Sequence, residues 1–168
     1  MTAQILVPLD GSPLAEQALG CAMTLGRGLP AELVLIRAVS IPLDTREILN
    51  NAGLKAAALM EQLDVEANDY LRKVAGQLQD AGLSVRQVVQ HGPAAEANVD
   101  YAEQKNIRQI VMATHGYTGI SRWTHGSVAE RVLQSASVPV LLVRAQEGEQ
   151  GASREPMSCQ RILIPLDA

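Results

Sequence analysis

Five short apolar segments, separated by segments with helical periodicity, constrain the fold of this 168-residue chain more than any other feature. Between the short segments, apolar side chains recur every three or four positions, which is the spacing of one helix face. Strands that alternate with helices predict an α/β fold, an open parallel five-stranded sheet with helices on both faces. The predicted strands cover residues 4–9, 32–39, 85–90, 107–113 and 138–143, and the predicted helices cover residues 13–25, 56–81, 94–104 and 127–135.

Local signals predict where two of these helices begin and end. Ser12 followed by Pro13 is typical of a helix start, because a hydroxyl caps free N–H groups and proline fits the first helical position. Gly82 is expected to close the long helix of residues 56–81, since glycine accepts the backbone conformation that commonly ends a helix.

Charge and composition exclude several classes of protein. The formal net charge is −4 and no run of Lys or Arg occurs, so the basic footprint of nucleic-acid binding is missing. No apolar stretch reaches about 18 residues, which predicts no membrane span. The first residues lack the pattern of a signal peptide. Cys21 and Cys159 lack metal-site spacing and are expected to be free thiols of a cytoplasmic protein.

Two unusual turns predict a ligand site. Asp10-Gly11-Ser12 follows the first strand and Thr114-His115-Gly116 follows the fourth. In open α/β sheets ligands bind beyond the carboxyl ends of strands, where the strand order reverses, so neighbouring first and fourth strands would line one crevice. The second turn leads through a glycine loop to a helix that opens at Gly126-Ser127. Because a helix N-terminus favours negatively charged groups, the sequence predicts a site for the phosphate chain of a nucleotide.

Several of these residues also have an ordinary structural interpretation. Asp10 could simply brace its turn, because Asp is common in turns, and Ser127 could simply cap its helix. Capping is compatible with ligand contact. His115 and His125 flank the loop without other metal ligands at suitable spacing, so no metal site is predicted. His115 is expected beside the ligand and His125 in solvent.

Motifs of several enzyme classes are missing. The chain has no GxxxxGK[ST] loop, no GxGxxG after the first strand and no GxSxG nucleophile elbow. Phosphoryl transfer needs a metal-holding acid and a residue that orients the nucleophile, and Asp10 is the one acid near the predicted site. No catalytic residue is therefore predicted, and slow hydrolysis of a bound nucleotide is the remaining enzymatic alternative.

Two segments resemble the universal stress protein family. ILVPLDGSPLAEQAL resembles its first strand and helix, and VMATHGYTGISRWTHGSVAERVLQSASVPVLLVR resembles its C-terminal signature. The resemblance covers roughly residues 3–144. Nucleotide-binding members carry a glycine, two residues, a glycine, nine residues, and then glycine followed by Ser or Thr. Here this pattern falls on Ala113, Gly116, Gly126 and Ser127, so an alanine replaces the first glycine.

The resemblance implies the strand order 3-2-1-4-5 of an adenine nucleotide alpha-hydrolase-like fold, with ATP across the ends of the first and fourth strands. The turn after the first strand would wall the adenosine, and the end of the second strand would line the adenine edge. The glycine loop and the last helix would contact ribose and phosphates, which would carry Mg²⁺ or Mn²⁺. The implied ATP contacts are Pro8, Leu9, Asp10, Ala38, Met112, Ala113, His115, Gly116, Gly126, Ser127 and Val128.

The C-terminal residues repeat the start of the chain. ILIPLD, over residues 162–167, differs at one position from ILVPLD, over residues 5–10. This is either a chance resemblance between two apolar strands or the first strand of a second copy of the fold, cut off. We therefore expect a domain over residues 1–144, a polar linker over residues 145–159 and a truncated second repeat over residues 160–168.

The resemblance implies an ATP-binding, cytoplasmic protein that acts as a regulatory or protective module. Members of the family commonly pair through the edge of the fifth strand, so a homodimer is expected. Two alternatives remain open. One is a nucleotide-independent dimer that works through protein–protein contacts, which Ala113 favours, and the other is a slow ATPase.

Overall fold

Five parallel strands form one sheet in the computed structural model, which describes residues 2–42, 44–45, 47–48, 56–114 and 127–144. The strand order is β3-β2-β1-β4-β5, and each neighbouring pair is parallel, so the predicted α/β fold is confirmed. The elements in chain order are β1 (Ala3–Pro8), α1 (Pro13–Glu16), α2 (Ala18–Gly28), β2 (Ala31–Val39), α4 (Ala56–Asp80), β3 (Ser84–His91), α5 (Ala94–Gln104), β4 (Gln109–Thr114), α6 (Ser127–Ser135) and β5 (Val140–Arg144).

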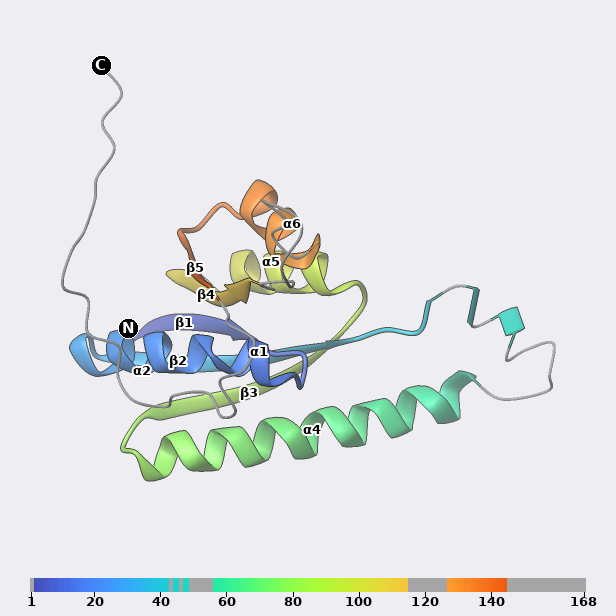
Figure 1. The fold of residues 1–168 in the computed structure, drawn as a ribbon, viewed down its shortest axis with the longest axis horizontal. Helices are drawn as coiled ribbons and strands as arrows, with labels where there is room; N and C mark the ends of the chain where they lie inside the picture. Colours follow the sequence, from blue (N-terminus) through green and yellow to red (C-terminus); the bar gives the residue numbers. More distant parts are fainter. Residues whose placement is uncertain (1, 43, 46, 49–55, 115–126, 145–168) are drawn as a thin grey trace, which may run out of the picture.

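Helices cover both faces of the sheet, with α4 on one side and α5 and α6 on the other (Figure 1). Side chains of α1, α2 and α4 pack in one core layer, and those of α5 and α6 pack in a second. Along β1, Ile5 and Val7 belong to the first layer and Leu6 to the second, as the two-residue period of a strand requires. Because both faces are buried, the central strands need apolar residues at successive positions, which explains the continuous apolar runs.

The helix predicted over residues 13–25 is divided in the structure. Ser12 caps α1 as predicted, because its Oγ accepts a hydrogen bond from the N–H of Ala15 at 3.1 Å, and Pro13 is the first helical residue. The N–H of Gln17 then donates to the carbonyl of Leu14, three residues back, at 3.2 Å. This tighter bond closes α1, and α2 begins after it. The prediction of one continuous helix was therefore wrong at Gln17.

The end of α4 has the turn that the sequence predicts. Gly82 has a φ of +83°, and its N–H donates to the carbonyl of Gln79 at 2.8 Å. The N–H of Leu83 donates to the carbonyl of Leu78 at 3.1 Å. These bonds satisfy carbonyls of the last helical turn, and the positive φ strains any residue that carries a Cβ. Gly82 therefore closes the long helix.

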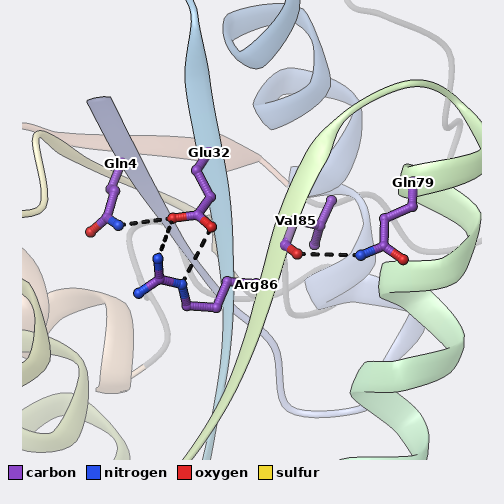
Figure 2. Close-up of polar contacts among 5 residues, drawn as sticks. All are labelled: Gln4, Glu32, Gln79, Val85 and Arg86. Atoms are coloured by element: carbon purple, nitrogen blue, oxygen red, sulfur yellow. Dashed lines mark hydrogen bonds and ion pairs between the residues drawn. The ribbon is translucent and has the colours of Figure 1, made fainter. Parts of the chain in front are cut away.

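Polar contacts join three strands at the amino end of the sheet. Figure 2 shows the carboxylate of Glu32, on β2, between side chains of β1 and β3. Gln4 Nε2 donates to it at 2.8 Å, and Arg86 Nη2 lies 2.9 Å from it. In the same view, Gln79 of α4 donates to the carbonyl of Val85 at 3.3 Å. These contacts lie at the end of the sheet opposite to the turns that follow β1 and β4.

The two central strands β1 and β4 pair over a short length. Two register pairs join them, around Leu6 and Ile110, whereas six pairs join β1 to β2. Beyond Leu6 the chain stays with β2, because the N–H of Leu9 donates to the carbonyl of Ile36 at 2.9 Å. The carboxyl ends of β1 and β4 therefore separate where the strand order reverses, which is the place where open α/β folds bind ligands.

Two glycines at the end of α4 are expected to respond in opposite directions to alanine. Gly76 lies inside α4 and an added Cβ would meet no atom within 4 Å. Gly76→Ala should therefore raise the free energy of unfolding by about 0.5–1 kcal/mol. Gly82 has equally open space but a φ of +83°, so Gly82→Ala should lower it by about 1 kcal/mol. Urea unfolding measures both, and destabilisation by Gly76→Ala would contradict the prediction.

Candidate functional site

A cavity lies at the carboxyl ends of β1, β2 and β4, where side chains of α5 and α6 form its opposite wall. Its empty volume, counting the open mouth, is about 560 Å³. The enclosed space that a water molecule can enter is about 100 Å³, so most of this volume belongs to the open mouth. Alanine, leucine, isoleucine, valine, proline and methionine make up most of its lining, so the cavity suits a flat apolar group.

The turn after β1 forms one wall of the cavity. Asp10 lines it, and Asp10 Oδ1 accepts a hydrogen bond from the N–H of Ser12 at 2.8 Å. The carboxylate therefore braces its turn and also lies on the cavity wall. Gly11, between the two, has a φ of +92°, and an added Cβ would lie 3.3 Å from the guanidinium of Arg37. Both the backbone conformation and this close approach favour glycine at residue 11.

Tyr70 of α4 lies behind this turn and connects it to α1. Its hydroxyl donates a hydrogen bond to Glu16 Oε1 at 3.1 Å, and the Arg37 guanidinium carbon lies 5.2 Å from the centre of its ring. Burial, and then the negative charge of Glu16 and the hydrogen bond to it, raise the pKa of Tyr70 well above its ordinary value of 10.0. Tyr70 therefore remains a neutral hydrogen-bond donor that holds α1 against α4.

The ends of β2 and β4 contribute the floor of the cavity. Ile36 and Met112 belong to the core layer of α5 and α6, and Ala38 shares the face of Ile36 because the two are two residues apart. Ala113 lines the cavity at the end of β4. The small side chains of Ala38 and Ala113 leave space that larger residues would fill.

The helices α5 and α6 form the other wall. Ala94 and Asn98 come from α5, and Val128 and Ala129 come from the first turn of α6. The first turn of a helix carries N–H groups without intrahelical partners, together with a partial positive charge. The cavity therefore reaches the positive end of α6. Ser127 begins this helix but is exposed and is not among the residues that line the cavity.

The structure brings many of the predicted contact residues to one place. Residues at the ends of the first, second and fourth strands share the cavity with a residue of α6, although they are far apart in the sequence. The predicted contacts that line it are Pro8, Leu9, Asp10, Ala38, Met112, Ala113 and Val128. The predicted contacts His115, Gly116 and Gly126 lie outside the described residues, as do His125, the linker and the segment 160–168.

Five residues of the cavity wall are not among the predicted contacts. Ile36 could have been inferred from Ala38, because alternate residues of a strand share a face. Asn98 lies at helical spacing from the buried residues Ala95 and Ala102. A polar residue on this apolar stripe was therefore the available signal. The additional lining residues are Ala15, Ile36, Ala94, Asn98 and Ala129.

The cavity wall combines an apolar surface with few polar groups. Asp10 is the acidic residue among those that line it, and Asn98 contributes an amide. Within the described residues, no group of three or more His, Cys, Asp or Glu side chains could hold a metal ion. The wall can therefore enclose a flat ring and accept hydrogen bonds from it or from hydroxyl groups.

Among the described helices, none has the length and apolar character to cross a membrane.

Comparison with known proteins gives a family match. The model of the universal stress protein family matches residues 1–144 of the chain. The universal stress protein MJ0577 of Methanocaldococcus jannaschii is 31% identical over 159 residues, covering 86% of this chain and 96% of that protein. A solved structure of MJ0577 has a TM-score of 0.72 at 28% identity, covering 88% of this chain and 99% of that one.

Two further solved structures share the fold at lower identity. A universal stress protein in complex with cAMP has a TM-score of 0.63 at 18% identity, covering 86% of this chain and 98% of that one. The universal stress protein from Archaeoglobus fulgidus in complex with dAMP has a TM-score of 0.60 at 16% identity, covering 84% of this chain and 97% of that one. The shared architecture is the adenine nucleotide alpha-hydrolase-like fold.

Removal of the Tyr70 hydroxyl is expected to lower stability in a pH-dependent way. Tyr70→Phe keeps the ring but loses the hydrogen bond to Glu16, so the free energy of unfolding should fall by about 1 kcal/mol at pH 7. Because the folded pKa is raised, the contribution of Tyr70 is complete below pH 10.0 and is lost as the pH rises above it. Urea unfolding from neutral to alkaline pH should show a smaller alkaline loss in the variant.

Glu16→Gln is the matched control for this effect. It keeps an acceptor for the Tyr70 hydroxyl and removes the negative charge, so the pKa of Tyr70 should fall towards its ordinary value. Phenolate absorbance of the folded protein, followed during an alkaline titration, measures the change. An unchanged phenolate titration in Glu16→Gln, or an alkaline loss of stability as large in Tyr70→Phe as in the wild type, would contradict the role that the structure gives to this contact.

Proposed function

Since this chain belongs to the universal stress protein family, we propose that its cavity binds an adenine nucleotide, ATP in particular. The observation that carries the proposal is the cavity itself. It opens where β1 and β4 separate, and its wall ends at the first turn of α6. An apolar recess next to a helix N-terminus suits a ligand with a flat ring at one end and negative charge at the other.

The adenosine moiety would occupy the apolar part of the cavity. Small side chains at Ala38 and Ala94 leave room for a ring, and Pro8 and Met112 provide apolar surface. Asp10 lies on the same wall, where a carboxylate accepts hydrogen bonds from ribose hydroxyls in other nucleotide-binding folds. These contacts give the turn after β1 a function in addition to its internal hydrogen bond.

The phosphates would extend towards the first turn of α6. N–H groups near Val128 and the hydroxyl of Ser127 would donate hydrogen bonds to them, and Gly116 and Gly126 are proposed to complete the phosphate site. Mg²⁺ or Mn²⁺ would be held through the phosphate oxygens. Ala113, where the family pattern has glycine, adds one methyl group to the wall of this region.

Adenine nucleotides in two structures of the same fold support this assignment. One universal stress protein was solved with cAMP and another with dAMP. The two ligands share the adenine base and differ in their sugar and phosphate groups. The common requirement is therefore a recess for adenine, which the apolar part of the present cavity can provide.

The proposed biological role is that of a cytoplasmic regulatory or protective module. A nucleotide in the cavity would touch β1, β4 and α6 together, and would thereby hold the two halves of the sheet in one arrangement. The protein with bound nucleotide would therefore be more stable than the empty protein, and a partner protein could distinguish the two forms. This role does not require turnover of the nucleotide. Slow ATP hydrolysis remains compatible with the same site.

A nucleotide-independent dimer is the second candidate function. The observation that favours it is β5, which is an edge strand of the sheet and pairs with β4 along one side. Its residues Val140–Leu142 are partly exposed. An edge strand of this kind can pair with the same strand of a second copy. In this case the contact surface, and not the cavity, would carry the function.

Ala38→Leu is expected to weaken nucleotide binding without unfolding the protein. The larger side chain would fill the recess at the end of β2, so the affinity for ATP should fall at least about tenfold. Isothermal titration calorimetry with Mg²⁺ and ATP measures this loss. Ala58→Leu, at an exposed residue of α4, is the matched control and should bind as the wild type does.

Nucleotide released from the denatured, purified protein gives an independent measurement. Ala113→Gly restores the glycine of the family pattern and should bind ATP at least as tightly as the wild type. If neither the wild type nor Ala113→Gly binds ATP, and neither releases adenine nucleotide on denaturation, the proposed function is wrong.

The oligomeric state is expected to be a homodimer formed through β5. Light scattering during size-exclusion chromatography should give twice the mass of one chain, because pairing would cover the free edge of β5. A dimer of the same strength with and without ATP would favour the nucleotide-independent function. A monomer at all concentrations would contradict the edge pairing.

A further inference from the structure

Asn98 is a buried polar residue in the wall of the proposed nucleotide site. It lies on α5 with Ala95 and Ala102 on the same buried face, and its exposed fraction is 2%. Among the described residues, Asn98 is the one buried residue in the polar and charged class. Its Oδ1 has no hydrogen-bond partner in the described part of the chain. The same residue lines the cavity that holds Asp10 and Ala38.

An unpartnered amide oxygen in this position is unfavourable for the empty protein. Burial removes water from the oxygen, and the surrounding helix face offers alanine and tyrosine side chains of a packed core. Leucine has the same number and branching of side-chain heavy atoms as asparagine, and it would bury without this cost. The amide is therefore best explained by a group that enters the cavity and donates a hydrogen bond to it.

The chemistry of the oxygen limits which part of a nucleotide can fill this role. Phosphate oxygens accept hydrogen bonds, whereas the Asn98 oxygen needs a donor. The positive end of α6 attracts the phosphates, and the Asp10 carboxylate suits the ribose hydroxyls. The remaining donor of an adenine nucleotide is the exocyclic amine of the base. A side-chain amide matches the adenine edge well, because it can accept from this amine and donate to a neighbouring ring nitrogen.

We propose that Asn98 is a specificity-determining residue that recognises the exocyclic amine of adenine. This inference rests on the proposed function and specifies how that site selects its base. The apolar side chains at Ala38, Ala94 and Met112 hold the faces of the ring, and the amide of Asn98 reads its edge. Selection follows because a base without the amine leaves the buried oxygen unpaired.

The test compares two ligands that differ in the amine alone. ATP and purine riboside triphosphate, which has hydrogen in place of the amine, are titrated into the full chain by calorimetry. The wild type should bind ATP about tenfold more tightly than the analogue, as expected for one buried hydrogen bond. Asn98→Leu should bind ATP about tenfold more weakly than the wild type and should bind the two ligands within about twofold of each other.

Two further variants keep the result decisive. Asn98→Ala removes the amide without adding volume and should also lose the preference for ATP. The role of Asn98 can therefore be tested even if the leucine variant does not fold. Asn68→Leu makes the same substitution at an exposed residue of α4 and should keep the preference. In the absence of nucleotide, Asn98→Leu should melt at the same temperature as the wild type or higher, because an unpaired buried polar atom is removed.

The outcomes separate this inference from the proposed function. Binding of ATP by the wild type without preference over the analogue overturns the role of Asn98 and leaves the nucleotide site intact. An equal loss of both ligands in Asn98→Leu and Asn98→Ala also overturns it, since a purely structural residue would give that result. Failure of the wild type to bind either ligand overturns the proposed function, and the role of Asn98 with it.

Discussion

The position of β1 at the centre of the sheet determines most of this structure. It pairs with β2 on one side and β4 on the other, and its side chains alternate between two core layers. A strand that is buried on both faces needs apolar residues at its central positions, and the turn that follows it brings the chain back to water. That turn, at Asp10 and Gly11, therefore has a specific backbone conformation and is also accessible to solvent. The cavity lies beside it because the neighbouring strand β4 diverges there.

The fold could be predicted from the sequence because local and long-range signals agree. Buried strands appear as continuous apolar runs, and Ser12, Pro13 and Gly82 mark helix ends with hydrogen bonds that the structure contains. The break at Gln17 could not be predicted, since apolar residues keep their helical spacing across it. At that residue a three-residue hydrogen bond to Leu14 replaces the regular helical one.

The candidate site could be predicted in part. Asp10 and Met112 line one cavity, as predicted. The prediction was possible because ligands bind at strand ends where the strand order reverses, and the alternation of strands and helices in the sequence indicates this topology. The sequence places Asn98 on the apolar stripe of α5, but it does not show that the amide oxygen lacks a partner. Its meaning depends on burial and on the missing partner of Oδ1, and both are properties of packing between α5 and the sheet. For the same reason Ala94 and Ala129 are contacts that no motif identifies.

The pairing of β1 with β4 is the shortest strand-to-strand pairing in the sheet. Two register pairs join these strands, whereas eight join β2 to β3 and five join β4 to β5. We expect local opening to follow this boundary, so that β4, α6 and β5 separate from the remaining three strands at a lower free energy than global unfolding. Amide protons along this boundary would exchange before those of β2. A ligand bound across this boundary would then hold β1 and β4 together and determine how often this local opening occurs.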